Sequence, residues 1–234
     1  EKVTVGPSEA MSKSKKNIID PENVIQKFGT DAIRWFILSD SPPSKDIQWS
    51  EEGISASFKF IQKLWNLNLN IINRKGKKID KNEDNKLEKY NIKMFFNINK
   101  NLENFQYNVV IANFYDIYNN YITFIDNQKI SSDYLKKNFE KILILIMPIL
   151  PHFASECLTM LNSKLNLENI SWPVYNKALI EESDCNIVIQ INGKKRSLIR
   201  LPINSNESFV VKKAKQESNV KKYLINNNVK KQIY

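Results

Sequence analysis

The sequence is poor in the residues that support hydrolytic and metal chemistry. It contains one histidine, His152, and two cysteines, Cys157 and Cys185. A structural zinc site takes four Cys or His ligands, so no metal site is expected. One isolated histidine also gives no support for a Ser-His-Asp or Cys-His catalytic arrangement. Two cysteines are too few for a disulfide framework, and they favour a reducing, cytoplasmic setting.

Glycine, proline and long apolar runs are also scarce. With 5 glycines and 8 prolines in 234 residues, the chain is neither collagen-like nor a linker. The longest apolar run, residues 142–150, contains a proline, whereas a membrane-spanning helix needs about 20 apolar residues. No apolar leader opens the sequence, and position 1 is not Met. We therefore expect no membrane contact, and we expect the chain to be a piece of a longer protein.

Basic residues are abundant but unevenly placed. The net charge is +10, and 31 of the 35 basic residues are lysine, which is typical of AT-rich codon usage. Residues 186–234 nevertheless carry 11 basic against 2 acidic side chains, while residues 101–185 carry 6 against 10. Codon usage alone would spread lysine evenly. A compact basic segment is typical of phosphate-binding surfaces, although a merely solvated lysine-rich surface is the alternative.

Helical periodicity dominates residues 20–162. Asp20-Pro21 predicts a helix start and Gly29 its end, and Ser50 begins a long helix with acids in its first turn. The polar stretch 74–84 is predicted as a loop. One buried stripe is expected on the long helix, made of Ile54, Phe58, Ile61, Trp65, Asn68 and Ile71 or Ile72. Further amphipathic helices are predicted at residues 85–104, 108–126 and 133–147, with a short one ending near residue 161.

The pattern changes after Trp172-Pro173. Two strand-like runs, residues 187–191 and 197–201, flank Asn192-Gly193, which is the strongest short signal for a hairpin turn. Two short helices follow at about 206–216 and 218–226, and the last six residues read as the start of another strand. The fold class is therefore mainly α, a helical bundle followed by a small, incomplete α+β domain.

The sharpest local motif is the polar run at residues 11–17 (MSKSKKN). Compact ammonium groups on such a loop can hold a triphosphate and bind departing pyrophosphate more strongly as its charge grows. The run lacks the glycine-rich cradle of a P-loop. On its own, a short Ser/Lys-rich run is more often a solvated loop.

The surrounding sequence resembles a known family. Residues 6–53 read GPSEAMSKSKKNIIDPENVIQKFGTDAIRWFILSDSPPSKDIQWSEEG, which resembles the KMSKS loop of class I aminoacyl-tRNA synthetases and the segment after it. Pro42-Pro43 with Asp46 and Trp49-Ser50 is similar to leucyl-tRNA synthetases. Later pieces of the family follow in order: Leu150-Pro151-His152 with Glu156, Trp172-Pro173, and residues 188–194 (VIQINGK) with Arg196.

This resemblance implies part of an enzyme that activates leucine with ATP and charges leucine tRNA. It assigns Met11, Ser12, Lys13 and Ser14 to ATP binding, with Lys13 as the catalytic lysine, and Ala10 stands where the family has another lysine. For the complete enzyme, the resemblance implies ATP and leucine as substrates, together with Mg²⁺. It also implies that the complete enzyme is cytoplasmic and monomeric. Because the family's upstream HIGH motif is missing, we expect this piece to be inactive alone.

The resemblance also divides the chain. It implies a KMSKS-loop and stem-contact segment (1–49), an anticodon-binding-type bundle (50–172), a linker (173–185) and a basic C-terminal domain (186–234). Eight basic residues are candidate tRNA contacts: Arg74, Lys75, Lys77, Lys78, Lys194, Lys195, Arg196 and Arg200. For the cluster that begins at Arg74, a solvated loop is an equally good interpretation.

Other residues and other functions were weighed against this interpretation. His152 reads as a helix-start residue with local hydrogen bonds rather than as a base. The aromatic residues between 114 and 124 read as bundle core rather than as a base-stacking surface, and Glu181, Glu182 and Asp184 read as a solvated linker. The rival functions are an isoleucyl-, valyl- or methionyl-tRNA synthetase and a free-standing tRNA-binding module without catalysis.

Overall fold

The computed structural model describes residues 9–76, 80–162, 167–175, 184–202, 205–225, 229 and 231–233. The chain divides into two compact units, Glu1–Asn176 and Lys177–Tyr234, and each is described by itself. The boundary falls inside the segment 173–185 that the sequence analysis assigned to a linker. The limits of the individual domains stay predictions.

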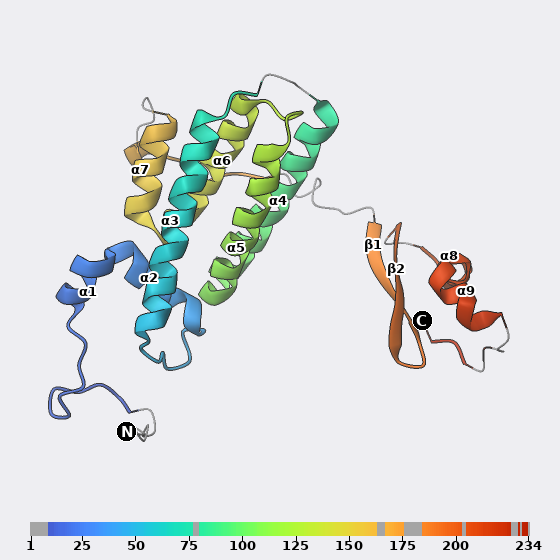
Figure 1. Cartoon of the computed structure of the whole chain (residues 1–234), viewed down its shortest axis with the longest axis horizontal. Helices are drawn as coiled ribbons and strands as arrows, with labels where there is room; N and C mark the ends of the chain where they lie inside the picture. Colours follow the sequence, from blue (N-terminus) through green and yellow to red (C-terminus); the bar gives the residue numbers. More distant parts are fainter. Residues whose placement is uncertain are drawn as a thin grey trace. The chain divides into compact units, whose positions relative to one another are not determined.

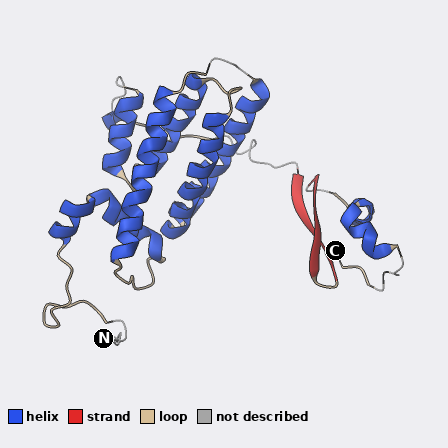
Figure 2. Cartoon of the chain, viewed as in Figure 1, coloured by secondary structure: helices blue, strands red, loops and turns tan. Residues whose placement is uncertain are grey.

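The first unit is helical, and its longer helices run beside one another as a bundle (Figures 1 and 2). Two shorter helices precede the bundle and pack at one end of it. The described elements are α1 (Pro21–Phe28), α2 (Thr30–Asp40), α3 (Glu51–Asn73), α4 (Lys81–Glu103), α5 (Tyr107–Asp126), α6 (Ser132–Ile146), α7 (Pro151–Leu161) and the 3₁₀ turn η1 (Leu167–Asn169). The predicted mainly α fold class is confirmed.

Side-chain caps account for where the helices begin. The Asp20 carboxylate accepts the Glu22 N–H at the start of α1, and the Ser50 hydroxyl accepts the Gly53 N–H at the start of α3, so both predicted starts are confirmed. Asp80 caps α4 in the same way. Because of that cap and the acids in the first turn, residues 81–84 are helical, and the prediction of a loop there was wrong.

Aromatic and aliphatic side chains fill the bundle core around the fully buried Trp35 and Phe114. The predicted stripe on α3 was only partly right. Ile54, Asn68 and Ile71 are buried as predicted, but Phe58, Ile61 and Trp65 are half-buried, and the buried places between them belong to Ser57, Phe60, Leu64 and Leu67. The reason is that α3 packs against α2, α5, α6 and α7, so more than one of its faces is covered.

The second unit is a two-stranded antiparallel hairpin with two helices. Strands β1 (Asp184–Ile191) and β2 (Lys194–Pro202) join at Asn192-Gly193, both in the left-handed region (φ 52° and 74°). The predicted hairpin turn is therefore confirmed. Ile199 and Leu201 pack with Val210 of α8 (Glu207–Gln216), and α9 (Ser218–Leu224) follows. The predicted final strand was wrong for the described residues 229 and 231–233, which are not in a strand.

Candidate functional site

The predicted run at residues 11–17 contains a turn at residues 13–16 and precedes α1. We call residues 10–17 the lysine loop. The Lys16 N–H donates to the Lys13 carbonyl at 3.2 Å, and Lys16 has a φ of 53°. The Lys15 N–H and the Ser14 hydroxyl both contact the Ser12 hydroxyl oxygen, at 3.3 and 3.2 Å. Lys13 is exposed on this turn. The geometry therefore presents an accessible ammonium group on a folded turn, which can approach a polyphosphate.

The other lysines of the lysine loop are not equivalent to Lys13. The Lys15 ammonium pairs with the Glu9 carboxylate at 2.8 Å, and both side chains are about half exposed (51% and 54%). An exposed pair of this kind stabilises little. It nevertheless offers Lys15 a competing carboxylate, so the Lys15 ammonium is less available to an anion than those of Lys13 and Lys16.

Asp31, in the first turn of α2, binds the start of α7. Its carboxylate accepts the Phe153 N–H at 2.7 Å and lies 2.9 Å from His152 Nδ1. The α7 helix begins without a side-chain cap from its own N-cap residue, Leu150. Asp31 therefore supplies the cap from another helix, where a carboxylate is favoured by the helix dipole. The His152 side chain is at a helix start as predicted, but its partner lies 121 residues away, so the prediction of local bonding was wrong.

Arg34, one helical turn further along α2, holds the chain just before α7. Its Nε donates to the Ile149 carbonyl at 2.9 Å, and its Nη2 donates to the Pro148 carbonyl at 2.6 Å. We call Asp31 and Arg34 the α2 clamp. Together they make four polar contacts from α2, two to the turn between α6 and α7 and two to the first turn of α7.

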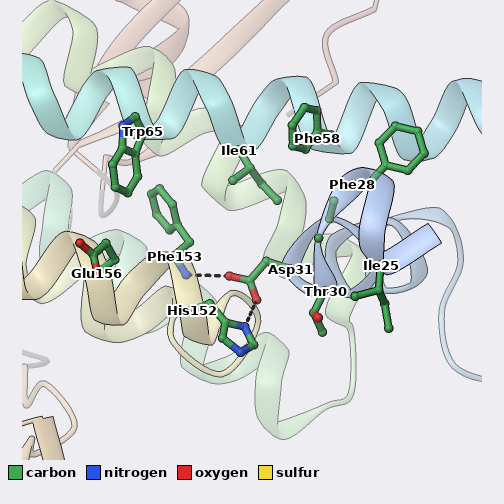
Figure 3. A pocket seen from close by; sticks show the side chains of 12 residues that line it. Ile25, Phe28, Thr30, Asp31, Phe58, Ile61, Trp65, His152, Phe153 and Glu156 are labelled. Atoms are coloured by element: carbon green, nitrogen blue, oxygen red, sulfur yellow. Dashed lines mark hydrogen bonds and ion pairs between the residues drawn. The ribbon is translucent and has the colours of Figure 1, made fainter. Parts of the chain in front are cut away.

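A shallow pocket of about 480 Å³ lies beside the α2 clamp, between α1, α2, α3 and α7 (Figure 3). Apolar side chains form most of its wall, among them Ile61, Trp65 and Phe153. The Asp31 carboxylate lines the pocket, but it is already bonded to the Phe153 N–H and to the His152 ring (Figure 3). The Asp31 carboxylate is therefore not available as a free acid or base in the pocket, and Glu156 is the other carboxylate in its lining. Within the described residues, no group of three His, Cys, Asp or Glu side chains could hold a metal ion.

Arg74, predicted as a possible tRNA contact, is turned toward its own protein. Its Nε donates to the Ile125 carbonyl at 2.8 Å and its Nη2 to the Asn127 carbonyl at 2.6 Å. Burial lowers the pKa of the Arg74 guanidinium from its ordinary value. These bonds join the end of α3 to the end of α5. Lys75 is exposed, and Lys77 and Lys78 lie outside the described residues.

A structural role for Arg74 predicts an effect on stability. Arg74→Lys removes the planar fork that reaches two carbonyls at once, and we expect the free energy of unfolding to fall by about 1–2 kcal/mol. Urea denaturation followed by tryptophan fluorescence measures this change. Lys75→Gln is the matched control, because an exposed neighbour should change stability by no more than about 0.5 kcal/mol. Equal stability of the two variants would contradict a structural role for Arg74.

The basic side chains of the second unit are mostly exposed. Lys194 and Lys195 follow the hairpin turn directly, and both are exposed, as is Arg200. Arg196 is half-buried because its guanidinium lies over the Tyr223 ring, 4.2 Å from the ring centre. The two helices add five more exposed lysines, namely Lys212, Lys213, Lys215, Lys221 and Lys222. The hairpin and helices thus present a basic surface.

The aromatic side chains of α5 belong mainly to the core. Phe114 and Tyr121 are fully buried, and Tyr118 and Phe124 pack against the same core. Tyr115 is 40% exposed, but its hydroxyl accepts the Trp35 indole N–H at 3.3 Å. Burial raises the pKa of Tyr121 above its ordinary value. These contacts favour the core interpretation over base stacking. Glu181 and Glu182 lie outside the described residues.

Comparison with family models matches residues 84–212 to the anticodon-binding domain of tRNA ligases. The chain belongs to this family. Residues 4–50, which contain the lysine loop and the α2 clamp, match class I tRNA synthetases for Ile, Leu, Met and Val. The tRNA-ligase family therefore accounts for the segment before the bundle, for the bundle from α4 onward, and for the hairpin of the second unit.

Curated relatives indicate which tRNA ligases the chain is most similar to among those compared. The leucine–tRNA ligase of Orientia tsutsugamushi is 39% identical and that of Bartonella quintana 34% identical, each covering 99% of this chain. The chain spans 27% of the length of these curated relatives. The predicted resemblance to leucyl-tRNA synthetases is confirmed, because the match runs through both units and not only through the shared loop.

A solved structure supports the fold of this tRNA-ligase domain. The LeuRS of Agrobacterium radiobacter K84 agnB2, crystallised in a ternary complex with tRNA and LeuAMS, superposes with a TM-score of 0.76 at 23% identity. The superposition covers 96% of this chain and 30% of that one. At this identity the likeness shows a shared fold.

Sequence reasoning missed three residues of the site. It placed Asp31 and Arg34 in a family block without a role, because their partners lie more than 110 residues away. It also included Asn17 as the last residue of the run at 11–17 but gave no role to its side chain, which bonds to two main-chain groups at the start of the lysine loop. An Asn directly after a Ser/Lys turn and shortly before a helix cap was the available signal.

Proposed function

We propose that this chain is the part of a leucine–tRNA ligase that supplies the ATP-phosphate lysine loop and tRNA-binding surfaces. The observation that carries the proposal is the match to leucine–tRNA ligases along 99% of the chain. The complete ligase would use ATP, as its magnesium complex, to form leucyl-adenylate and then charge leucine tRNA. On the same resemblance we infer a cytoplasmic enzyme that acts as a monomer.

In this proposal the lysine loop acts at the triphosphate. Met11, Ser12, Lys13 and Ser14 form the ATP-binding turn, and Lys13 binds the pyrophosphate that leaves when leucine is activated. A positioned ammonium group contributes to catalysis if its attraction grows with the charge that develops in the transition state. The exposure of Lys13 on a folded turn supports this role.

The second unit would bind the tRNA backbone. Seven exposed lysines surround its hairpin turn and helices, with Arg200 exposed as well. Lysine is suited to phosphate as a point charge, and such contacts position a nucleic acid without reading its bases. Lys194, Lys195, Arg196 and Arg200 are therefore proposed as backbone contacts. Arg74 is left out of this set because its donors are used inside the bundle.

A salt titration tests the tRNA surface. The ligands are leucine tRNA and one unrelated tRNA, and the proteins are the full chain and a version that ends at Asn176, which keeps the bundle core. For the full chain we expect the logarithm of the affinity to fall steeply with the logarithm of salt concentration, by about 0.9 for each phosphate neutralised. The shorter version should bind weakly with a flatter slope.

A charge-matched pair of variants locates the surface. Lys194→Gln with Lys195→Gln should reduce the slope by up to about 2. Lys59→Gln with Lys63→Gln removes the same charge from exposed positions on α3 and should leave the slope unchanged. If the two pairs behave alike, or if the truncated chain binds as well as the full chain, the second unit is not the tRNA-binding surface. A complete protein that binds tRNA but lacks pyrophosphate exchange would favour the free-standing binding module.

A further inference from the structure

The side chain of Asn17, the last residue of the lysine loop, bonds back to the start of the loop. The Ser12 N–H donates to Asn17 Oδ1 at 2.8 Å, and Asn17 Nδ2 donates to the Ala10 carbonyl at 3.3 Å. A single amide thus bonds to two main-chain groups on the opposite arm of the turn. The amide oxygen accepts one main-chain N–H and the amide nitrogen donates to one main-chain carbonyl, so both ends of the side chain are hydrogen-bonded.

The position of these bonds matters for Lys13. They hold residues 10 and 12 against residue 17, and the four residues between them, 13–16, form the exposed turn. The Lys16 N–H bond to the Lys13 carbonyl closes the same turn from inside. Asn17 is only partly exposed, whereas every residue of the turn is exposed. The lysines of the turn are therefore held by hydrogen bonds rather than by packing, and the Asn17 bonds are the ones that join the two arms of the loop.

We propose that Asn17 is the positioning residue of the lysine loop, and that it acts on adenylate formation through Lys13. The proposal rests on the proposed function, in which Lys13 meets the ATP phosphates. Without the Asn17 amide, the turn must be ordered when the transition state forms, and that entropy cost raises the barrier. Asn17 itself is not placed in contact with the nucleotide.

The test is a double-mutant cycle in the complete ligase, read out by leucine-dependent pyrophosphate exchange. Asn17→Ala alone should lower kcat by roughly 10-fold, the effect of one to two ordinary hydrogen bonds, with little change in the KM for leucine. In a Lys13→Ala background the same substitution should have almost no further effect, because it acts through a side chain that is gone. Asn23→Ala is the matched control, since Asn23 bonds to Asp20 outside the loop.

The outcomes separate this inference from the proposed function. If Lys13→Ala leaves the exchange rate unchanged, the proposed function of the loop fails. If Lys13→Ala slows exchange but Asn17→Ala does not, the positioning role of Asn17 is overturned. Multiplicative effects of the two substitutions would also overturn it, because they would show that Asn17 acts independently of Lys13.

Discussion

Lys13→Ala in the complete ligase is expected to slow leucine-dependent pyrophosphate exchange by a factor on the order of 10²–10³. This is the range seen when one preorganised group that stabilises transition-state charge is removed. The physical reason is that Lys13 lies exposed on a turn that is closed by main-chain and Asn17 bonds, so its charge is placed before the reaction begins. Steady-state exchange at saturating ATP and leucine measures the effect.

A substitution at the neighbouring Lys15 and a measurement of tRNA affinity serve as controls for the Lys13 substitution. Lys15→Ala removes the same charge from the same turn, but Lys15 is paired with Glu9, so we expect a much smaller decrease in the exchange rate. The tRNA affinity of the Lys13→Ala protein should be unchanged, which separates loss of chemistry from loss of folding. Equal effects of Lys13→Ala and Lys15→Ala would show that the loop contributes only its net charge.

Asp31→Ala is expected to lower the free energy of unfolding of the first unit by about 2 kcal/mol. Loss of a helix cap costs about 1 kcal/mol and up to about 2, and the buried Phe153 N–H is left without its acceptor. All four tryptophans, Trp35, Trp49, Trp65 and Trp172, lie in the first unit. Urea unfolding followed by tryptophan fluorescence therefore reports on this unit alone.

The matched variants for this prediction lie on the same helix. Asp31→Asn keeps an oxygen that can accept the Phe153 N–H. We therefore expect it to lower the free energy of unfolding by about half as much as Asp31→Ala does. Asp40→Ala removes an exposed carboxylate at the other end of α2 and should change stability by no more than about 0.5 kcal/mol. An unfolding midpoint of Asp31→Ala equal to that of the unchanged protein would contradict the cap from α2 to α7.

The fold was largely predictable because its signals are local. The caps at Asp20 and Ser50 and the turn at Asn192-Gly193 act over three or four residues, and all three are confirmed. The stripe on α3 was only partly predictable. A helix that is covered on several faces does not reveal from its own sequence which of its apolar residues are deepest, since neighbouring helices decide this.

The candidate site likewise combines a local motif that the sequence predicts with long-range contacts that it does not predict. The lysine loop is one continuous run, so a single motif indicated it. The guanidinium of Arg74 could equally have faced tRNA or carbonyl oxygens, and only the position of α5 decides between them. The partners of Asp31 and Arg34 come from the turn before α7, a segment that no spacing rule connects to α2. Contacts of this kind depend on tertiary structure.

The α2 clamp has a consequence for sequence variation. Three of its four contacts end on main-chain atoms, the carbonyls of Pro148 and Ile149 and the N–H of Phe153. A carbonyl is present whatever side chain a residue carries, and an N–H is present in every residue except proline. Substitutions at the exposed Pro148 can therefore leave the junction with α2 intact, whereas Asp31 and Arg34 cannot be exchanged without losing it. Ile149 and Phe153 are restricted for another reason, because their side chains are buried in the core. In a mutational scan, we expect Pro148 to tolerate more substitutions than Asp31 or Arg34.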